Sequence, residues 1–171
     1  MNEKQRQLLA FVQELAPQAD PQSIRLGGLM HRLGHALYQL SEESLAAADL
    51  SFAQYRILMD LLFSERIEAC PGLNPSDLSE RQGVTRNTVS SLIRNLEEDG
   101  LIARQLDAED RRRFIIRLTD KGREKVQDHA NRHFTMLSDC FGMLAPGEKE
   151  TMIRLLRKLG EHPQIDLTGV K

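Results

Sequence analysis

Residues 74–119 carry a series of helix, turn and strand signals whose order leaves few folds open. Asn74 followed by Pro75 is typical of a helix start, because an Asn side chain caps free backbone N–H groups and Pro fits the first helical position. Gly83 suits a turn after this short helix, since a left-handed backbone costs glycine little. The segment therefore opens with a short capped helix and a tight turn.

The second half of the segment predicts another helix and then a hairpin. The helix is expected from Arg86 to about Asp99, and strands are expected at residues 102–106 and 113–118. On the second strand the alternating apolar residues Phe114, Ile116 and Leu118 are expected to point inward. The order helix, turn, helix, hairpin predicts a winged helix-turn-helix lobe. In such a lobe one helix enters the DNA major groove while the hairpin loop reaches the neighbouring minor groove.

The second helix has one apolar and one polar face. Four apolar side chains share a side and are expected to pack inward: Val89, Leu92, Ile93 and Leu96. The candidates for DNA contact lie around the opposite side, and they are Thr85, Arg86, Asn87, Thr88, Ser90, Ser91 and Arg94. Short hydrogen-bonding groups and arginines suit base edges and phosphates. An ordinary solvated face has the same composition, so the turn before this helix and the hairpin after it favour DNA.

Charge supports the same segment. The chain has a formal net charge of −2, which argues against a non-specific nucleic-acid binder. Residues 81–123 hold 10 Lys/Arg against 7 Asp/Glu, a net +3, whereas residues 1–80 hold 6 against 11 and residues 124–171 hold 7 against 7. Positive charge is therefore concentrated where phosphate would have to be met.

The chain resembles the MarR family of transcriptional regulators from about residue 24 onward. Thr85 opens a helix that ends in the sequence LEEDGLI at residues 96–102, which matches the family's "LE..GLI" passage into the wing. The wing signature "D-x-R...LT" is matched by Asp110, Arg112, Leu118 and Thr119, followed by Gly122. The resemblance implies that Arg112 enters the minor groove and that Asp110 orients it through an ion pair. It assigns phosphate contacts to Arg111 and Arg113.

The resemblance also implies an architecture. The expected fold is mainly α with a small β-hairpin wing, a winged helix-turn-helix lobe joined to a helical dimerisation lobe. Residues 1–171 form a single MarR-like domain in this scheme. Its expected parts are an extension helix at 2–16, dimerisation helices at 24–47 and 119–161, and a DNA-binding lobe at 51–118. A two-fold homodimer would present two recognition helices about one DNA turn apart, and hence bind double-stranded DNA at an inverted repeat.

Members of the family often bind small organic effectors between the two lobes. The helices that would border such a site carry His31, His35, Tyr38, Tyr55 and Arg56. Arg56 would suit a carboxylate or a phenolate, although a structural ion pair is an equal alternative. The tryptophan that many urate- and phenolate-responsive members use is absent, because the chain has no Trp. The effector itself cannot be identified from the sequence.

Other chemistries have weaker support. The pairs His31/His35 and His129/His133 have the i, i+4 spacing that can bind a metal, but buried core histidines are commoner, so no metal and no cofactor are expected. Cys70 and Cys140 do not match the family's peroxide-sensing position, and an inert thiol is expected at both.

The expected function is a sequence-specific transcriptional regulator, a homodimeric repressor released from a palindromic operator by a small organic effector. The alternatives are a winged-helix adaptor that binds protein and a metal-sensing regulator. No catalytic set stands out, so an enzyme is not expected. No apolar run approaches membrane-spanning length and the N-terminus lacks a signal-peptide layout, so a cytoplasmic location is expected.

Overall fold

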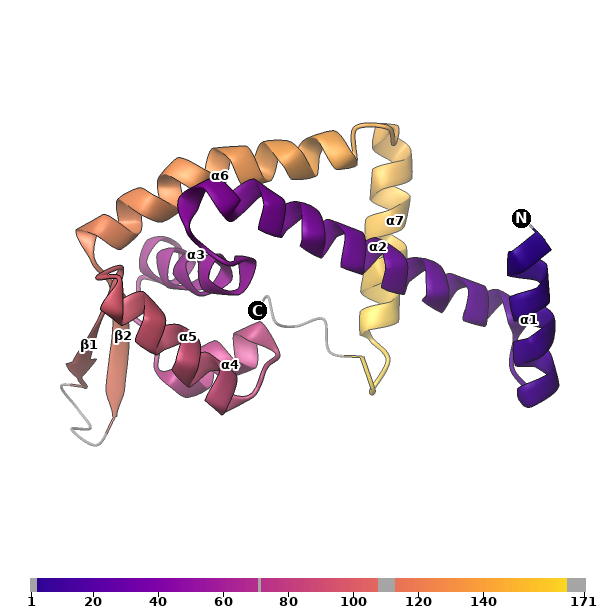
Figure 1. Cartoon of the computed structure of the whole chain (residues 1–171), viewed down its shortest axis with the longest axis horizontal. Helices are drawn as coiled ribbons and strands as arrows, with labels where there is room; N and C mark the ends of the chain where they lie inside the picture. Colours follow the sequence, from indigo (N-terminus) through magenta and orange to yellow (C-terminus); the bar gives the residue numbers. More distant parts are fainter. Residues whose placement is uncertain (1–2, 71, 108–112, 166–171) are drawn as a thin grey trace. The chain divides into compact units, whose positions relative to one another are not determined.

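The computed structural model describes residues 3–70, 72–107 and 113–165. In these ranges the regular secondary structure is helical apart from one two-stranded hairpin (Figure 1). The elements in chain order are α1 (Glu3–Leu15), α2 (Pro21–Leu45), the 3-10 helix η1 (Ala46–Ala48), α3 (Phe52–Arg66), α4 (Pro75–Gln82), α5 (Arg86–Glu98), β1 (Ile102–Leu106), β2 (Phe114–Leu118), α6 (Asp120–Cys140) and α7 (Pro146–Gly160). The predicted fold class, mainly α with a β-hairpin wing, is confirmed.

The chain divides into two compact units, Met1–Glu43 and Ser44–Lys171. The first unit contains α1 and most of α2. Asp20 caps α2, since its carboxylate accepts hydrogen bonds from Ser23 N at 2.9 Å and from Gln22 N at 3.2 Å. Pro21 is the first residue of α2, where a missing N–H costs nothing. No helix among the described residues is long and apolar enough to cross a membrane.

In the second unit α4 and α5 form the predicted helix-turn-helix. The side chain of Asn74 accepts hydrogen bonds from Ser76 N and Asp77 N at 2.8 and 2.9 Å, and Pro75 follows it in the first turn. Gly83 ends α4 with φ at 64°, a left-handed conformation that favours glycine. Thr85 then caps α5 by accepting from Thr88 N at 3.2 Å. Local sequence thus fixes both ends of the turn.

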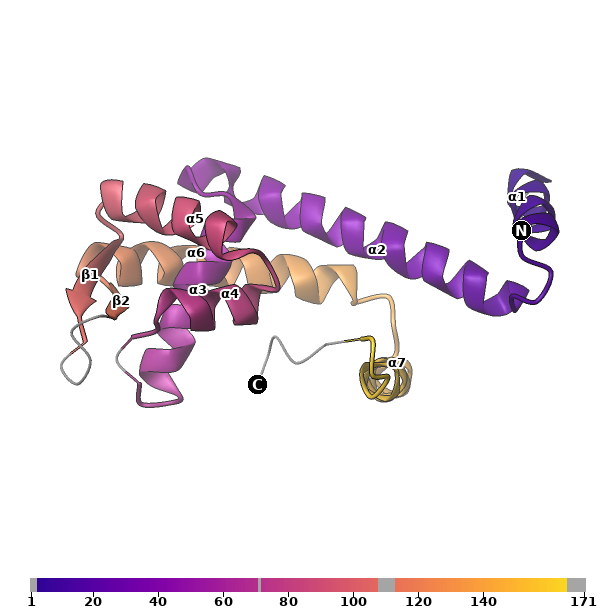
Figure 2. The same ribbon diagram turned by 90° about the horizontal axis from the view of Figure 1, so that it is seen from below.

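The hairpin extends from the end of α5 and leads into α6 (Figures 1 and 2). Its strands are antiparallel, with Ile102 opposite Leu118 and Leu106 opposite Phe114. Ile116 and Leu118 are buried as expected, but the expectation for Phe114 is wrong, because its side chain is 46% exposed. Phe114 and its cross-strand neighbour Leu106 lie at the end of the hairpin farthest from the junctions with α5 and α6, beyond the part that packs on the core.

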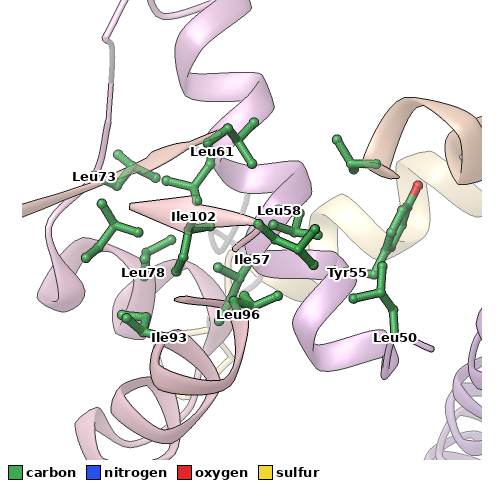
Figure 3. Packing of buried hydrophobic residues seen from close by; sticks show 14 of the residues in the cluster. Leu50, Tyr55, Ile57, Leu58, Leu61, Leu73, Leu78, Ile93, Leu96 and Ile102 are labelled. Atoms are coloured by element: carbon green, nitrogen blue, oxygen red, sulfur yellow. The ribbon is translucent and has the colours of Figure 1, made fainter. Parts of the chain in front are cut away.

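One continuous apolar core supports these elements. Side chains from α3, α4, α5 and the hairpin meet there, as the close-up in Figure 3 shows. Val89, Ile93 and Leu96 are at most 1% exposed, which confirms the predicted inward face of α5. Full burial of an aliphatic side chain contributes about 1.5–3 kcal/mol to folding. The recognition helix α5 is therefore anchored to the core by the apolar side chains of its inner face.

The junction between the hairpin and α6 is tightly packed. Thr119 caps α6 by accepting from Gly122 N at 3.0 Å, and its hydroxyl donates to Gly100 O at 2.8 Å. A Cβ at Gly122 would overlap the carbonyl group of Leu101. The glycine that follows the wing signature is therefore required by this close approach.

Candidate nucleic-acid interface

The outer face of α5 is polar and fully on the surface of the second unit. All of the predicted contact residues there are exposed: Thr85, Arg86, Asn87, Thr88, Ser90, Ser91 and Arg94. Within the described ranges neither Arg86 nor Arg94 forms an ion pair or a side-chain hydrogen bond. Both guanidinium groups thus remain available to an anionic partner, which suits phosphate or the acceptor edge of guanine.

Several hydroxyl groups on this face are already partnered within the helix. The hydroxyls of Thr85 and Thr88 are 2.9 Å apart, and that of Ser91 donates to Asn87 O at 3.2 Å. A hydroxyl that donates internally still has lone pairs to accept from a base amino group. Asn87 keeps its side-chain amide free for bidentate contact, within the part of the chain that the structure describes.

The base of the wing is tied to α5 by contacts that sequence analysis missed. Arg104 on β1 forms an ion pair with Glu97 at 2.8 Å. Lys121 Nζ donates to Asp99 O at 2.7 Å, at the negative end of the α5 dipole. The sequence shows basic residues after the acidic end of α5, but it does not show which of them pair with which acceptor.

The tip of the wing holds the remaining predicted contacts. Asp107 N donates to Arg113 O at 3.0 Å, and Arg113 is exposed. Asp110, Arg111 and Arg112 lie outside the described residues. Their assignment to the minor groove and to phosphate stays a prediction from the resemblance.

The predicted effector residues fall into two groups. His31, His35 and Tyr38 are exposed on α2 in the first unit. Tyr55 and Arg56 belong to α3 in the second unit, where Tyr55 is 2% exposed and Arg56 donates from Nη2 to Gln82 O at 3.4 Å. Arg56 therefore has a hydrogen bond to a main-chain carbonyl, and its predicted role in effector binding stays a prediction.

Tyr55 belongs to a buried aromatic cluster that includes His133 of α6. Their ring centroids are 5.2 Å apart, and Phe52 lies 5.4 Å from His133. Tyr55 Oη and His133 Nδ1 are both buried without a hydrogen-bond partner among the described residues. Burial raises the pKa of Tyr55 to about 12 and lowers the pKa of His133, because each charged form would lose its hydration. No group of three His, Cys, Asp or Glu side chains that could hold a metal is found in the described ranges.

These features define a winged-helix protein with a recognition helix and a wing. The sequence model of the MarR family matches residues 48–113. The HTH-type transcriptional repressor YetL of Bacillus subtilis (strain 168) is 28% identical over 142 residues, which cover 83% of this chain and 83% of YetL. The chain belongs to the MarR family of transcriptional regulators and is a DNA-binding protein.

Solved structures agree with this assignment. The MepR chain in the crystal structure of the S. aureus MepR–DNA complex is 30% identical in sequence to this chain. The two superpose with a TM-score of 0.68 over 77% of this chain and 91% of MepR. The structure of CouR from Rhodococcus jostii RHA1, solved with p-coumaroyl-CoA bound, has a TM-score of 0.70 over 87% of this chain and 99% of CouR. At 24% identity CouR shows the shared fold alone.

Proposed function

We propose that this protein is a homodimeric transcriptional repressor that binds an inverted-repeat operator and is released from it by a small organic effector. The observation that carries the proposal is the outer face of α5. It exposes short polar groups and two arginines that form no ion pair within the described part of the chain, while Val89, Ile93 and Leu96 on the opposite face are buried. Placed in a major groove, that face would offer amide, hydroxyl and guanidinium groups to base edges.

The proposed DNA contacts divide by role. Base readout is assigned to Asn87, Ser90, Ser91 and Arg94, and backbone contact to Thr85, Arg86 and Thr88 around the N-terminus of α5. In the wing, Arg112 is proposed to enter the minor groove, Asp110 to orient it, and Arg111 and Arg113 to contact phosphate. Arginine is favoured in a narrow minor groove because negative potential is concentrated there.

The proposed homodimer accounts for apolar side chains that a lone chain leaves in water. On α2, Leu29 and Leu33 are 47% and 43% exposed, and on α7, Ile153 and Leu155 are 49% and 50% exposed. No residue of α7 is buried. Amphipathic helices gain most of their stability from burying the apolar face, so a second copy of the chain is the proposed cover. Residues 24–47 and 119–161 are the proposed dimerisation helices.

The proposed effector is a small aromatic or anionic molecule. Tyr55 Oη and His133 Nδ1 support it. Both atoms are buried without a hydrogen-bond partner among the described residues, and such atoms carry a desolvation cost that a hydrogen-bonding ligand would remove. His31, His35, Tyr38 and Arg56 remain predicted contacts. An effector acts only through different affinities for the DNA-binding and the released form of the dimer.

Fluorescence anisotropy with a duplex taken from the DNA upstream of the gene for this protein tests the proposed DNA binding. We expect affinity to fall steeply with salt, because phosphate contacts release counterions.

Arg112→Ala should weaken binding by roughly 1–3 kcal/mol, and Asp110→Ala by less, since Asp110 acts through Arg112. Arg6→Ala, exposed on α1 and outside both the DNA-binding lobe and the proposed dimerisation helices, is the control and should bind as the wild type does. Wild-type affinity for Arg112→Ala would refute the assignment to the minor groove.

A DNA-release assay tests the effector. Salicylate-like acids should release the operator, whereas zinc and peroxide should not. Tyr55→Phe should weaken that release while leaving effector-free DNA binding unchanged, because it removes only the hydroxyl. Release by zinc that a chelator reverses and that His129→Ala abolishes would favour the metal-sensing alternative instead.

A further inference from the structure

Two hydrogen bonds join α3 to the last residue of α4. Gln82 is 7% exposed, and its side-chain Nε2 donates to Asp60 Oδ2. Its carbonyl O accepts from Arg56 Nη2 at 3.4 Å. Arg56 and Asp60 are four residues apart on α3 and so share one helix face. Gln82 is therefore held through both its side chain and its main chain from a single face of α3.

An ion pair reinforces the same end of α4. Arg81 Nη2 lies 2.7 and 3.0 Å from the two carboxylate oxygens of Glu68, just beyond the end of α3. Burial raises the pKa of the Asp60 carboxyl, while the Gln82 hydrogen bond and the positive charges of Arg81 and Arg56 oppose that rise and Glu68 adds to it. Gln82 thus supplies the neutral donor that helps keep a half-buried carboxylate ionised.

The position of Gln82 matters because the recognition helix begins four residues later, at Arg86. Gly83 N and Val84 N both bond back to α4, and the hydroxyl of Ser79 donates to Val84 O at 2.7 Å. These contacts make the turn a short rigid link between Gln82 and the α5 cap at Thr85. A displacement of Gln82 is therefore passed to the start of α5 rather than absorbed in the turn.

We propose that Gln82 is a positioning residue for DNA recognition, and that its links to Asp60 and Arg56 set the orientation of α5 relative to α3. It touches no DNA group in this scheme and acts through the backbone of the turn. The proposal rests on the proposed contact of α5 with DNA. It predicts that the links affect operator affinity more than they affect folding, because α5 is already anchored by its buried apolar face.

The test compares variants that keep the size of the side chain but change its hydrogen bonding. Gln82→Met removes the donor and should lower operator affinity roughly tenfold, the effect of losing a partner of a buried charged group. Gln82→Glu alone should also lower affinity, because it places two carboxylates together. Combining Gln82→Glu with Asp60→Asn exchanges donor and acceptor and should restore affinity to within about threefold of the wild type. Gln13→Met, exposed on α1 and outside both the DNA-binding lobe and the proposed dimerisation helices, is the matched control.

Thermal unfolding of each variant separates positioning from loss of the fold. The expected result is that Gln82→Met loses affinity while it stays folded at the temperature of the binding assay, and that the exchanged pair regains affinity. Unchanged affinity in Gln82→Met, or a loss that only follows a fall in melting temperature and is not rescued, would overturn the proposal. If the wild type and Gln13→Met failed to bind the operator, the proposed function would be refuted as well, which is a different outcome from a failure of the Gln82 proposal alone.

Discussion

His133 shows how a single buried residue couples this fold to pH. It is 6% exposed, and its ring lies 5.2 Å from Tyr55 and 5.7 Å from Phe134. Burial lowers its pKa, so the native protein holds the neutral imidazole at a pH at which the unfolded chain already binds a proton. The unfolded state then binds more protons than the native state, and the free energy of unfolding falls as pH falls.

We therefore expect stability to decline as pH is lowered through about 6.5, the ordinary pKa of histidine. His133→Leu removes this titration and should make stability less dependent on pH between about 7.5 and 5.5. Urea unfolding at several pH values measures the effect, with His129→Leu, one turn earlier and less buried, as the control. An equal slope with pH in the wild type and in His133→Leu would contradict this account of the aromatic cluster.

At the level of secondary-structure elements, the junction of the wing with α6 depends on one glycine. A Cβ at Gly122 would meet the Leu101 carbonyl group, whereas at Gly147, in the first turn of α7, it would meet no atom within 4 Å. Gly122→Ala should thus lower the free energy of unfolding by about 1–3 kcal/mol, the usual cost of overpacking. Gly147→Ala, the matched control, should leave it unchanged or raise it. Equal stability of the two variants by chemical unfolding would show that the junction can relax.

The outer face of α5 supports a prediction about sequence preference. Asn87 and Ser91 are exposed one turn apart, opposite the buried Val89 and Leu96. We expect the double variant Asn87→Ala/Ser91→Ala to select a different consensus from random duplexes, because it lacks the amide and hydroxyl groups with which the wild type would read base edges. Recovery of the wild-type consensus by the double variant would exclude base readout by these two side chains.

The elements were largely predictable from the sequence because their signals are local. The caps at Asn74 and Thr85, the turn at Gly83 and the inward face of α5 each depend on residues within one or two turns. The prediction that Phe114 is buried was wrong. Strand alternation shows which face of the hairpin a side chain lies on, but it does not show where the core beneath that face ends. The contacts of Gln82 could not be predicted, since its partners lie 22 and 26 residues earlier in the chain.

At the level of the whole molecule, the proposed recognition of an inverted repeat requires a two-fold assembly. The second unit has a continuous core of its own, which includes Val126 near the start of α6. Apolar side chains on α2 and α7 are left exposed in a single chain, as with Leu33 and Leu155. If a second copy covers them, two α5 helices are fixed at one spacing, and the operator must match that spacing.

The most direct test of the central claim is therefore the dependence of binding on half-site spacing. Two sets of inverted-repeat duplexes would be compared by fluorescence anisotropy. One set has half-sites about 10 base pairs apart, and the other has about 5 base pairs inserted at the centre. Sedimentation would give the number of protomers on each duplex. We expect two protomers on each duplex at the first spacing and a loss of affinity of roughly tenfold or more at the second, since the insertion turns one half-site to the opposite side of the DNA. Binding of one protomer with the same affinity at both spacings would contradict this expectation.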